Sequence, residues 1–469
     1  MFEQRENRPE QKELWIVAGD LPVATPDAFY RRVNQTLEKI GFAAEVWRIC
    51  APAYADASRG GRPGIDPVVY LKMLMVGFFE NLPSERAIAS RCADSLSVRG
   101  FLGYSLTEAT PDHSSLSVLR RRLSLEQFEA LHCVLLRALH RHGLLKGRHL
   151  GIDSSVIEAN ASLRELRQRN TEQKYWDYVK ELAAQAGVDP TDTKAVRRFD
   201  KKRPGRKTSN QEWFNPHDPE AKVGRTKDGA TDMIYKPEHV TDLESGAIVA
   251  VEVRPGDAAD NDQTLAQRVL CAVGTLAEAV REPAAQEQFG KTIVADEGYF
   301  ALQPIGELQQ IGVRTVIADP HAGRRRRDLP AEERATLRRA TRATTSVSGK
   351  ALLRLRGEHL ERSFAHTLDQ GGLRRATLRG CVNLTKREMI GALTSNLSLL
   401  LRTLFGVGTP KQWLAGARGA ALAFLLAAIF ALWRLIGTLF GPPRQVRRDS
   451  SSLSARSGRL FRHRPCFPL

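Results

Sequence analysis

Two aspartates beside predicted strands are the residues of this sequence best placed to do chemistry. Residues 292–295 (TIVA) predict a short buried strand, because three of the four are β-branched and none is charged. Asp296 follows at once, although aspartate is disfavoured in strands and costly to bury without a partner. Asp153 lies in the middle of another predicted strand, residues 149–159 (HLGIDSSVIEA). The alternative for Asp296 is an ordinary turn, for which Asp296 and Gly298 are typical residues.

A pair of adjacent carboxylates would need a cation between them. If the two predicted strands lie side by side, Asp153 and Asp296 come together, and their charges raise one pKa unless a cation balances them. Carboxylate oxygens without histidine or cysteine select hard cations. The two aspartates therefore predict a site for Mg²⁺ or Mn²⁺, and Glu297 is expected to be a neighbour rather than a ligand.

A third carboxylate is expected from a helix predicted over residues 350–368. The apolar face of this helix is formed by four residues: Leu353, Leu360, Phe364 and Leu368. At about 100° per residue, Glu361 lies within that face, where a carboxylate is costly to bury unless it is paired or bound to a metal. Glu358 points away from the face and should meet solvent. Glu361 is the predicted third ligand, and the alternatives are Glu358 or a surface glutamate without a ligand role.

The elements that must position these carboxylates follow a strand, hairpin, helix, strand, helix, strand, helix order. The remaining predicted elements are a hairpin of residues 232–242 and 247–253, a helix over 262–280, a helix over 302–311 and a strand over 314–318. This order predicts an α/β fold in which a mixed sheet is flanked by helices. Three antiparallel strands come first, and two parallel strands are added through helices.

Two segments of this region lack the patterns of sheet or core helix. Residues 160–230 are polar and charged, and we interpret them as an insertion that is partly helical around WDYVKELAAQAG. Residues 320–350 are rich in arginine and have no apolar stripe, which predicts a solvated, mobile segment.

The N-terminal part of the chain is predicted to be helical. A helix is expected at residues 27–40, an amphipathic one at 67–79, and a further one capped by Ser84. The next predicted helix follows PDHSS and carries three consecutive arginines: Arg120, Arg121 and Arg122. Short helices that end in an arginine-bearing one resemble a helix-turn-helix DNA-binding domain, and a plain helical bundle is the alternative.

The composition favours a polyanionic partner. The chain has 469 residues and a formal net charge of +17, so nucleic acid is the first candidate, acidic membrane the second, and a merely soluble basic protein the alternative. Its six cysteines form no CxxC pair, which argues against a structural zinc site or a disulfide scaffold and fits a reducing compartment. The charged start MFEQRENRPEQ predicts no secretory signal.

One apolar stretch, residues 419–433 (GAALAFLLAAIFALW), raises the question of a membrane. It spans 15 residues, whereas a bilayer-spanning helix needs about 20. A buried or dimer-forming helix is the favoured interpretation, with membrane insertion as the alternative. The basic tail after Pro442 is predicted to be disordered, either as a nonspecific DNA tether or as a decayed end of the reading frame.

Several stretches, in this order, resemble bacterial insertion-sequence transposases of the DDE type. They are GIDSSVIEAN, YKPEHVTDLESGAIVAV, PGDAADNDQT, VADEGY, GEHLERSFAH and RGCVNLTKREMIGALTSNLSLL. GRPGIDP and PDHSSLSVLRRRL are similar to the N-terminal domain of the same family, so the resemblance covers residues 15 to about 410. It implies an RNase H-like catalytic sheet with an α-helical N-terminal domain, and it makes Asp153, Asp296 and Glu361 the acidic triad.

The sequence departs from the family around the glutamate. The usual signature has Tyr and Arg before it and Lys about seven residues after it, but here those positions hold Arg354, Gly357 and Leu368. Other arginines are predicted to supply the DNA contacts in this region: Arg354, Arg356, Arg362, Arg374 and Arg375.

The resemblance implies two-metal phosphoryl transfer on DNA with two Mg²⁺ (or Mn²⁺) ions. One ion would activate water, and later a DNA 3′-hydroxyl, while the other would stabilise the leaving oxygen. The expected partners are the terminal repeats of the element and the target DNA, bound by a homodimer or higher oligomer in the bacterial cytoplasm, without a membrane. The alternatives are a metal-dependent nuclease on the same core and a catalytically inactive DNA-binding protein.

These expectations divide the chain into four parts. Residues 1–60 form a preface, and residues 61–145 form the helix-turn-helix-like DNA-binding domain. Residues 146–405 form the catalytic domain with its insertion at about 160–230. Residues 406–469 contain the apolar helix and the basic tail.

Overall fold

The computed structural model describes residues 25–54, 64–206, 209–323 and 329–415. The chain divides into two compact units, residues 1–414 and 415–469, and all elements named below belong to the first. The predicted apolar helix at 419–433 and the basic tail after Pro442 lie outside the described residues.

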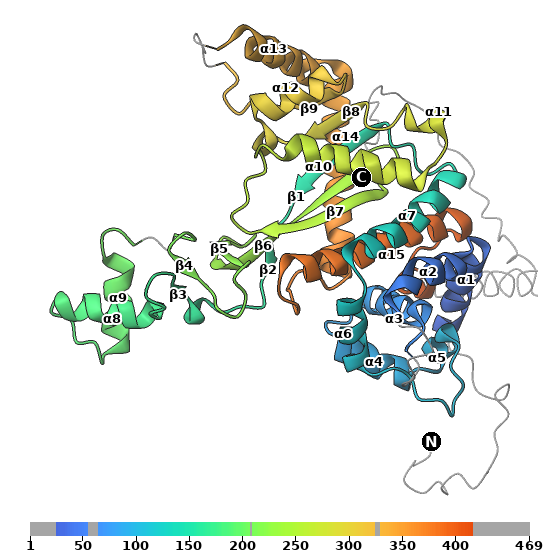
Figure 1. Cartoon of the computed structure of the whole chain (residues 1–469), viewed down its shortest axis with the longest axis horizontal. Helices are drawn as coiled ribbons and strands as arrows, with labels where there is room; N and C mark the ends of the chain where they lie inside the picture. Colours follow the sequence, from blue (N-terminus) through green and yellow to red (C-terminus); the bar gives the residue numbers. More distant parts are fainter. Residues whose placement is uncertain (1–24, 55–63, 207–208, 324–328, 416–469) are drawn as a thin grey trace, which may run out of the picture. The chain divides into compact units, whose positions relative to one another are not determined.

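A mixed sheet forms the centre of the described fold (Figure 1). Its main strands are β1 (His149–Ser154), β6 (Thr231–Asp242), β7 (Ile248–Pro255), β8 (Thr292–Ala295) and β9 (Arg314–Ile317). β1 pairs antiparallel with β6 and parallel with β8, β6 pairs antiparallel with β7, and β8 pairs parallel with β9. The predicted arrangement of three antiparallel strands and two parallel ones is therefore confirmed. Two shorter strands, β2 (Ile157–Glu158) and β5 (Lys222–Arg225), also pair with β6.

Helices cover both faces of the sheet, which explains why all four residues of β8 are buried and none is charged. Ile293 faces a core that includes residues of α10 (Leu265–Ala279), and Val294 faces the side of α14 (Val347–Phe364). Strands that are buried on both faces read as continuous apolar runs rather than alternating ones. The predicted helices at 262–280, 302–311 and 350–368 correspond to α10, α12 (Leu302–Gln310) and α14, and a π-helix (Ala365–Gln370) continues α14.

The prediction of a mobile segment at residues 320–350 is wrong for α13 (Ala331–Thr345), a regular helix that packs on α12 and β9. Its buried positions, Thr336 and Ala340, hold small side chains, and Leu337, which is half-buried, is the one large apolar residue of the helix, so the apolar stripe that signals a core helix is missing. Residues 324–328, which contain the arginine run, lie outside the described ranges.

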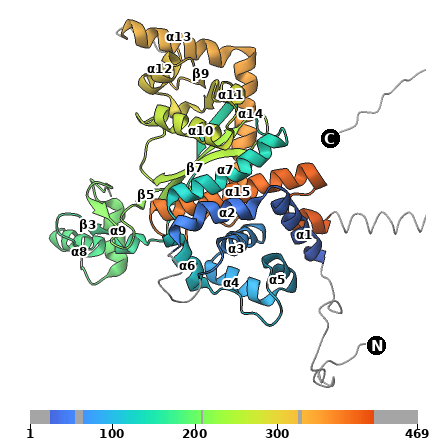
Figure 2. The same ribbon diagram turned by 45° about the vertical axis from the view of Figure 1, so that its right-hand side comes forward.

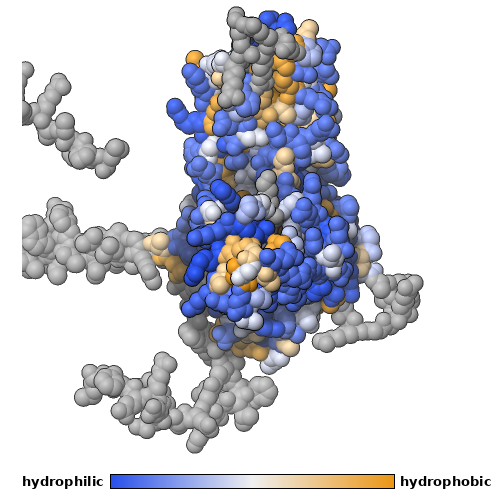
Figure 3. Space-filling view, turned by 90° about the vertical axis from the view of Figure 1, so that its left-hand side faces the viewer, coloured by the Kyte–Doolittle hydropathy of each residue, from blue (hydrophilic) through white to orange (hydrophobic). Residues whose placement is uncertain are grey.

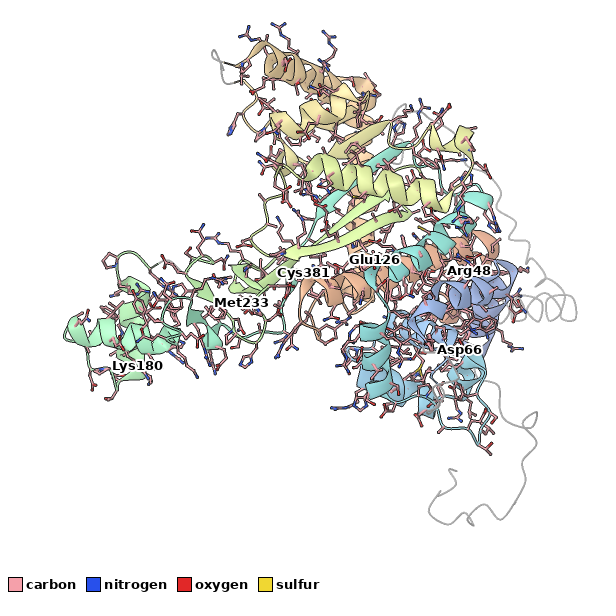
Figure 4. All side chains as sticks on the ribbon, viewed as in Figure 1. Arg48, Asp66, Glu126, Lys180, Met233 and Cys381 are labelled. Carbon is pink, nitrogen blue, oxygen red and sulfur yellow. The ribbon has the colours of Figure 1, made fainter. Side chains whose placement is uncertain are left out.

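The N-terminal helices gather around one long helix from the other end of the unit. They are α1 (Thr25–Lys39), α2 (Phe42–Cys50), α3 (Pro67–Phe79), α4 (Glu85–Asp94), α5 (Leu96–Leu102), α6 (His113–Arg122) and α7 (Leu125–Arg141). α15 (Cys381–Phe405) contacts α1, α3, α7 and β7 (Figure 2). The predicted cap is confirmed, because Ser84 Oγ accepts a hydrogen bond from the Ala87 amide. Asp66, labelled in Figure 4, caps α3 in the same way through the Val68 amide (2.8 Å).

By length and composition alone, the helical stretch Cys381–Ala415 could cross a membrane. However, 56% of its most apolar window is buried inside the protein. The core helix of a globular protein has the same character, and the contacts of α15 with β7 and α7 identify it as one.

The insertion is partly helical, as predicted. It contains α8 (Tyr175–Gln185), α9 (Thr193–Lys202) and a small sheet of β3 (Arg167–Gln168) and β4 (Trp213–Phe214), with Tyr175, Val179 and Trp213 in its core. Lys180 on α8 is exposed (Figure 4). From the side of the insertion the surface is mainly hydrophilic, with a hydrophobic area near the centre (Figure 3).

Candidate active site

Asp153 and Asp296 stand at matching positions on adjacent parallel strands. Gly151 of β1 pairs with Val294 of β8, and each aspartate follows two residues later in its chain. The predicted convergence of the two aspartates is therefore confirmed. Asp296 also makes the predicted turn, because its Oδ1 accepts a hydrogen bond from the Gly298 amide (2.9 Å). The turn and the site are thus compatible, and Asp296 Oδ2 is directed to the site.

A guanidinium group lies between the two carboxylates. Arg356 of α14 places Nη2 2.8 Å from Asp153 Oδ2 and 3.3 Å from Asp296 Oδ2. The side chain of Arg356 is only 14% exposed. Neither Nη2 nor Nε makes an aligned hydrogen bond to a described residue, so charge and position hold this arginine in place.

Burial dominates the electrostatics of Asp153. It raises the pKa of Asp153 from 3.8 to about 6; Arg356 opposes the rise, and Asp296 adds to it. The guanidinium thus does not fully offset the burial of Asp153, whose side chain is 22% exposed against 45% for that of Asp296. The pair can accept additional positive charge.

The expectation that Glu361 lies in the sheet-facing stripe is wrong, because its side chain is exposed. The side of α14 that faces the sheet carries Leu352, Arg356 and Leu360, which are spaced four residues apart. Leu353, which belongs to the predicted stripe, is only half-buried. Glu358 is exposed, as predicted, and pairs with Arg362 (2.6 Å).

The donor set fits a hard divalent cation in part. Asp153 and Asp296 offer carboxylate oxygens from two strand ends to one cation, which is the chemistry that Mg²⁺ or Mn²⁺ needs. Within the ranges that the structure describes, no three His, Cys, Asp or Glu side chains lie together closely enough to hold a metal ion. A third ligand would have to come from a side chain that faces elsewhere in this arrangement.

The sequence reasoning missed an ionic network behind Asp153. Asp260 Oδ1 accepts hydrogen bonds from Ser154 Oγ (2.9 Å), Lys236 Nζ (2.8 Å) and Arg254 Nη2 (3.0 Å). Ser154 directly follows Asp153, so Asp260 fixes the end of β1. The sequence signal for this network is the stretch PGDAADNDQT, which carries three aspartates, but two partners of Asp260, Ser154 and Lys236, are far away in the chain and are visible only in the structure.

A buried glutamate extends this network toward Asp296. Glu238 Oε2 contacts Arg254 Nη2 (3.0 Å), Glu238 Oε1 contacts Arg268 Nε (2.8 Å), and Tyr299 Oη donates a hydrogen bond to Glu238 Oε2 (2.8 Å). Burial raises the pKa of Glu238 even though both arginines act to lower it. Because Tyr299 follows Asp296 by three residues, the network connects the surroundings of both aspartates.

The three consecutive arginines of α6 have different surroundings. Arg120 forms an ion pair with Glu85 and is largely buried. Arg122 lies over the ring of Tyr54, at 5.2 Å from the centroid. Arg121 is exposed. A role of these side chains in DNA binding stays a prediction, and Arg121 is the one most open to a partner.

The other arginines predicted to bind DNA also divide into exposed and engaged ones. Arg354 and Arg375 are exposed; Arg375 has 80% of its side chain in solvent, although its Nε lies 3.7 Å from Glu158 Oε2. Arg374 pairs with Asp369 (2.6 Å), and Arg362 pairs with Glu358. Arg356 differs from all of these, since it lies within the site.

Comparisons with protein families agree with the geometry. Residues 148–397 match the model of the transposase DDE domain, and residues 22–122 match that of a transposase domain named DUF772. A search of curated proteins finds no match. Proteins of the DDE family have an RNase H-like core and generally use divalent metal ions, and the mixed sheet with Asp153 and Asp296 at its strand ends accords with both. With more than half of its length in the DDE domain, the chain belongs to the DDE transposases of insertion sequences.

Proposed function

We propose that this DNA transposase performs metal-dependent strand cleavage and strand transfer at the ends of its own element. The observation that carries the proposal is the convergence of Asp153 and Asp296 on one cationic group at the ends of two parallel strands. The proposed setting is the bacterial cytoplasm, with a homodimer or higher oligomer bound to the terminal repeats and the target DNA.

Asp153 and Asp296 would hold two Mg²⁺ or Mn²⁺ ions. When bound, such ions supply an activated oxygen nucleophile and stabilise the leaving oxygen of the phosphodiester. The chain supplies the placement of the ligands: Asp260 holds the end of β1 through Ser154, and the turn after β8 directs Asp296. We propose Glu361 as the third carboxylate, which would reach the pair only after α14 turns about its axis.

The proposed DNA contacts come from the exposed arginines of the regions named above. Arg121, Arg354 and Arg375 are exposed and can approach phosphates, although Arg375 would exchange a long ion pair with Glu158 (3.7 Å) for the phosphate. Contacts of this kind position the duplex and carry no sequence information themselves.

The central experiment measures Mg²⁺-dependent cleavage and strand transfer on DNA that carries the element's own ends. Asp153→Asn and Asp296→Asn each remove a ligand charge with little change in volume, so both should abolish cleavage and leave DNA binding nearly intact. Glu297→Gln is the matched control, because Glu297 is exposed and directly follows Asp296. Cleavage by either aspartate variant at more than a few per cent of the wild-type rate would contradict the proposal. Cleavage without strand transfer in the wild type would instead indicate a nuclease.

A second pair of variants tests the third carboxylate. Glu361→Gln should stop Mg²⁺-dependent cleavage, whereas Glu358→Gln should reduce it only modestly. Both side chains are exposed, so neither change should affect folding, which circular dichroism can check. Full activity of Glu361→Gln beside an inactive Glu358→Gln would assign the role to Glu358.

A further inference from the structure

We propose that Arg356 is the resident counter-ion of Asp153 and Asp296 and that it competes with the divalent cation for them. This inference rests on the proposed function, because it takes the two aspartates to be the metal ligands. It gives Arg356 a role in controlling metal occupancy that is separate from the DNA contact expected from the sequence.

Arg356 and a cation bound to the aspartates would lie in nearly the same place. Arg356 Nη2 lies 2.8 Å from Asp153 Oδ2, so a cation bonded to that oxygen at about 2.1 Å would lie within about 5 Å of the guanidinium. A cation that also touched Asp296 Oδ2, 3.3 Å from the same nitrogen, would overlap the guanidinium or face it closely. Two like charges at such a distance repel, and solvent screens the repulsion least beside Asp153 and Arg356, whose side chains are 22% and 14% exposed; the arginine and the metal therefore disfavour each other.

Arg356 is held at the aspartates by charge rather than by aligned hydrogen bonds. Its contacts with the aspartates are short, yet Nε and Nη2 make no aligned hydrogen bond to a described residue. Ion pairs without alignment lack much of the strength of bidentate arginine–carboxylate pairs. A divalent cation carries twice the charge and can therefore displace this side chain.

Arg356 and Glu361 lie on different faces of α14. Arg356 and Glu361 are five residues apart, so their side chains point about 140° apart around the helix axis. Both cannot face the strand ends at once. The arrangement with Arg356 at the aspartates therefore excludes Glu361, and a metal-bound arrangement with Glu361 as ligand requires Arg356 to leave. The π-helix Ala365–Gln370 directly follows α14, and its wider turn is a place where the helix can change phase.

The direct test is Mn²⁺ binding to the metal-free, full-length protein, measured by isothermal titration calorimetry. Arg356→Gln removes the competing charge and should bind Mn²⁺ about tenfold more tightly than the wild type. Arg356→Lys keeps the charge and should stay closer to the wild type. Arg354→Gln removes an exposed arginine from the same helix and is the control, for which we expect unchanged Mn²⁺ affinity. Equal affinities of the wild type and Arg356→Gln would overturn the inference.

A second measurement needs no variant at Arg356. Phenylglyoxal modifies accessible arginines, and mass spectrometry reports each site separately. Arg356 should be protected in EDTA and become several-fold more reactive with Mn²⁺, while the exposed Arg354 should react equally in both. Reactivity of Arg356 that does not change when Mn²⁺ binds would also overturn the inference.

Asp153→Asn separates the two proposals. If this change removes Mn²⁺ binding but Arg356 has no influence on it, the metal site stands and the competition fails. If Mn²⁺ binding survives the change, the aspartates are not the ligands, and the proposed function fails with the inference.

Discussion

Burial and the neighbouring Arg356 have opposite effects on the pKa of Asp153, and the effect of burial is the larger one. The pKa of Asp153 is raised from 3.8 to about 6. An acid with a raised pKa in the folded state destabilises the fold once it is ionised. This loss of stability is absent below the pKa of the unfolded state. It grows between the pKa values of the unfolded and folded states and is complete above the latter. The metal-free protein should therefore lose stability between about pH 4 and pH 6 through this residue.

Asp153→Asn should accordingly stabilise the metal-free protein at pH 8, by about 1–3 kcal/mol, because the amide carries no charge to bury. At pH 4 the effect should largely vanish, since the wild-type carboxyl is then protonated. Thermal unfolding in EDTA at the two pH values measures this. Glu297→Gln, at an exposed neighbouring position, should leave Tm nearly unchanged at both. Destabilisation of Asp153→Asn at pH 8 would mean that its pairing with Arg356 outweighs its burial.

The same pKa predicts the pH dependence of catalysis. A protonated carboxyl is a poor metal ligand, so Mg²⁺-dependent cleavage should rise with pH through about 6. Saturating Mg²⁺ should move the midpoint to lower pH, because the cation competes with the proton for Asp153. Initial cleavage rates at several pH values and two Mg²⁺ concentrations measure this. A midpoint that does not respond to Mg²⁺ would assign the titration to another group.

The sequence predicted the meeting of Asp153 and Asp296 because strand pairing decides it, but it could not predict the phase of α14. Leu352, Leu353, Leu355 and Leu360 offer more than one apolar stripe. In the structure Leu352 and Leu360 are buried, Leu353 is half-buried, and Leu355 is 36% exposed. The buried stripe includes Arg356. Its burial depends on two aspartates that are far from it in the sequence, at the ends of β1 and β8, and the local pattern of residues in α14 does not contain that information.

At the scale of elements, predictions succeeded where both faces of an element are covered or where a cap marks its end. β8 and α4 are examples: β8 is a buried, largely β-branched run without a charge, and α4 has a serine cap. α13 was missed because its buried stripe is made of small residues, with Thr336 and Ala340 at the contact. Hydrophobic periodicity does not detect a helix whose packing depends on small size rather than on apolar bulk.

The packing of α13 can be tested with one pair of variants. Ala340→Asp places a carboxylate in a buried position without a partner and should cost about 3 kcal/mol of stability. Thr341→Asp introduces the same residue at an exposed position of the same helix and should cost less than about 1 kcal/mol. Urea unfolding of the two variants gives the comparison. Equal losses would mean that α13 does not pack on β9 and α12 in solution.

At the scale of the whole molecule, the net charge of +17 matters for how the protein meets DNA. Arginines and lysines that neutralise phosphates release counter-ions, so affinity falls as a power of the salt concentration. With about six or more phosphate contacts, the slope of log affinity against log salt should be about −5 or steeper. Fluorescence anisotropy with duplex DNA at several salt concentrations measures it. A flat response would mean that the charge serves a purpose other than DNA binding.

The three arginines of α6 allow the DNA contact to be separated from the fold. Arg121 is exposed, so Arg121→Ala should reduce the magnitude of the salt slope by about 1 and leave Tm unchanged. Arg120 is largely buried in its pair with Glu85, so Arg120→Ala should lower Tm because it leaves that carboxylate without its partner. Its effect on the slope should be small as long as the variant is folded. The opposite result, a slope that depends on Arg120 and not on Arg121, would mean that α6 exposes a different face when it binds DNA.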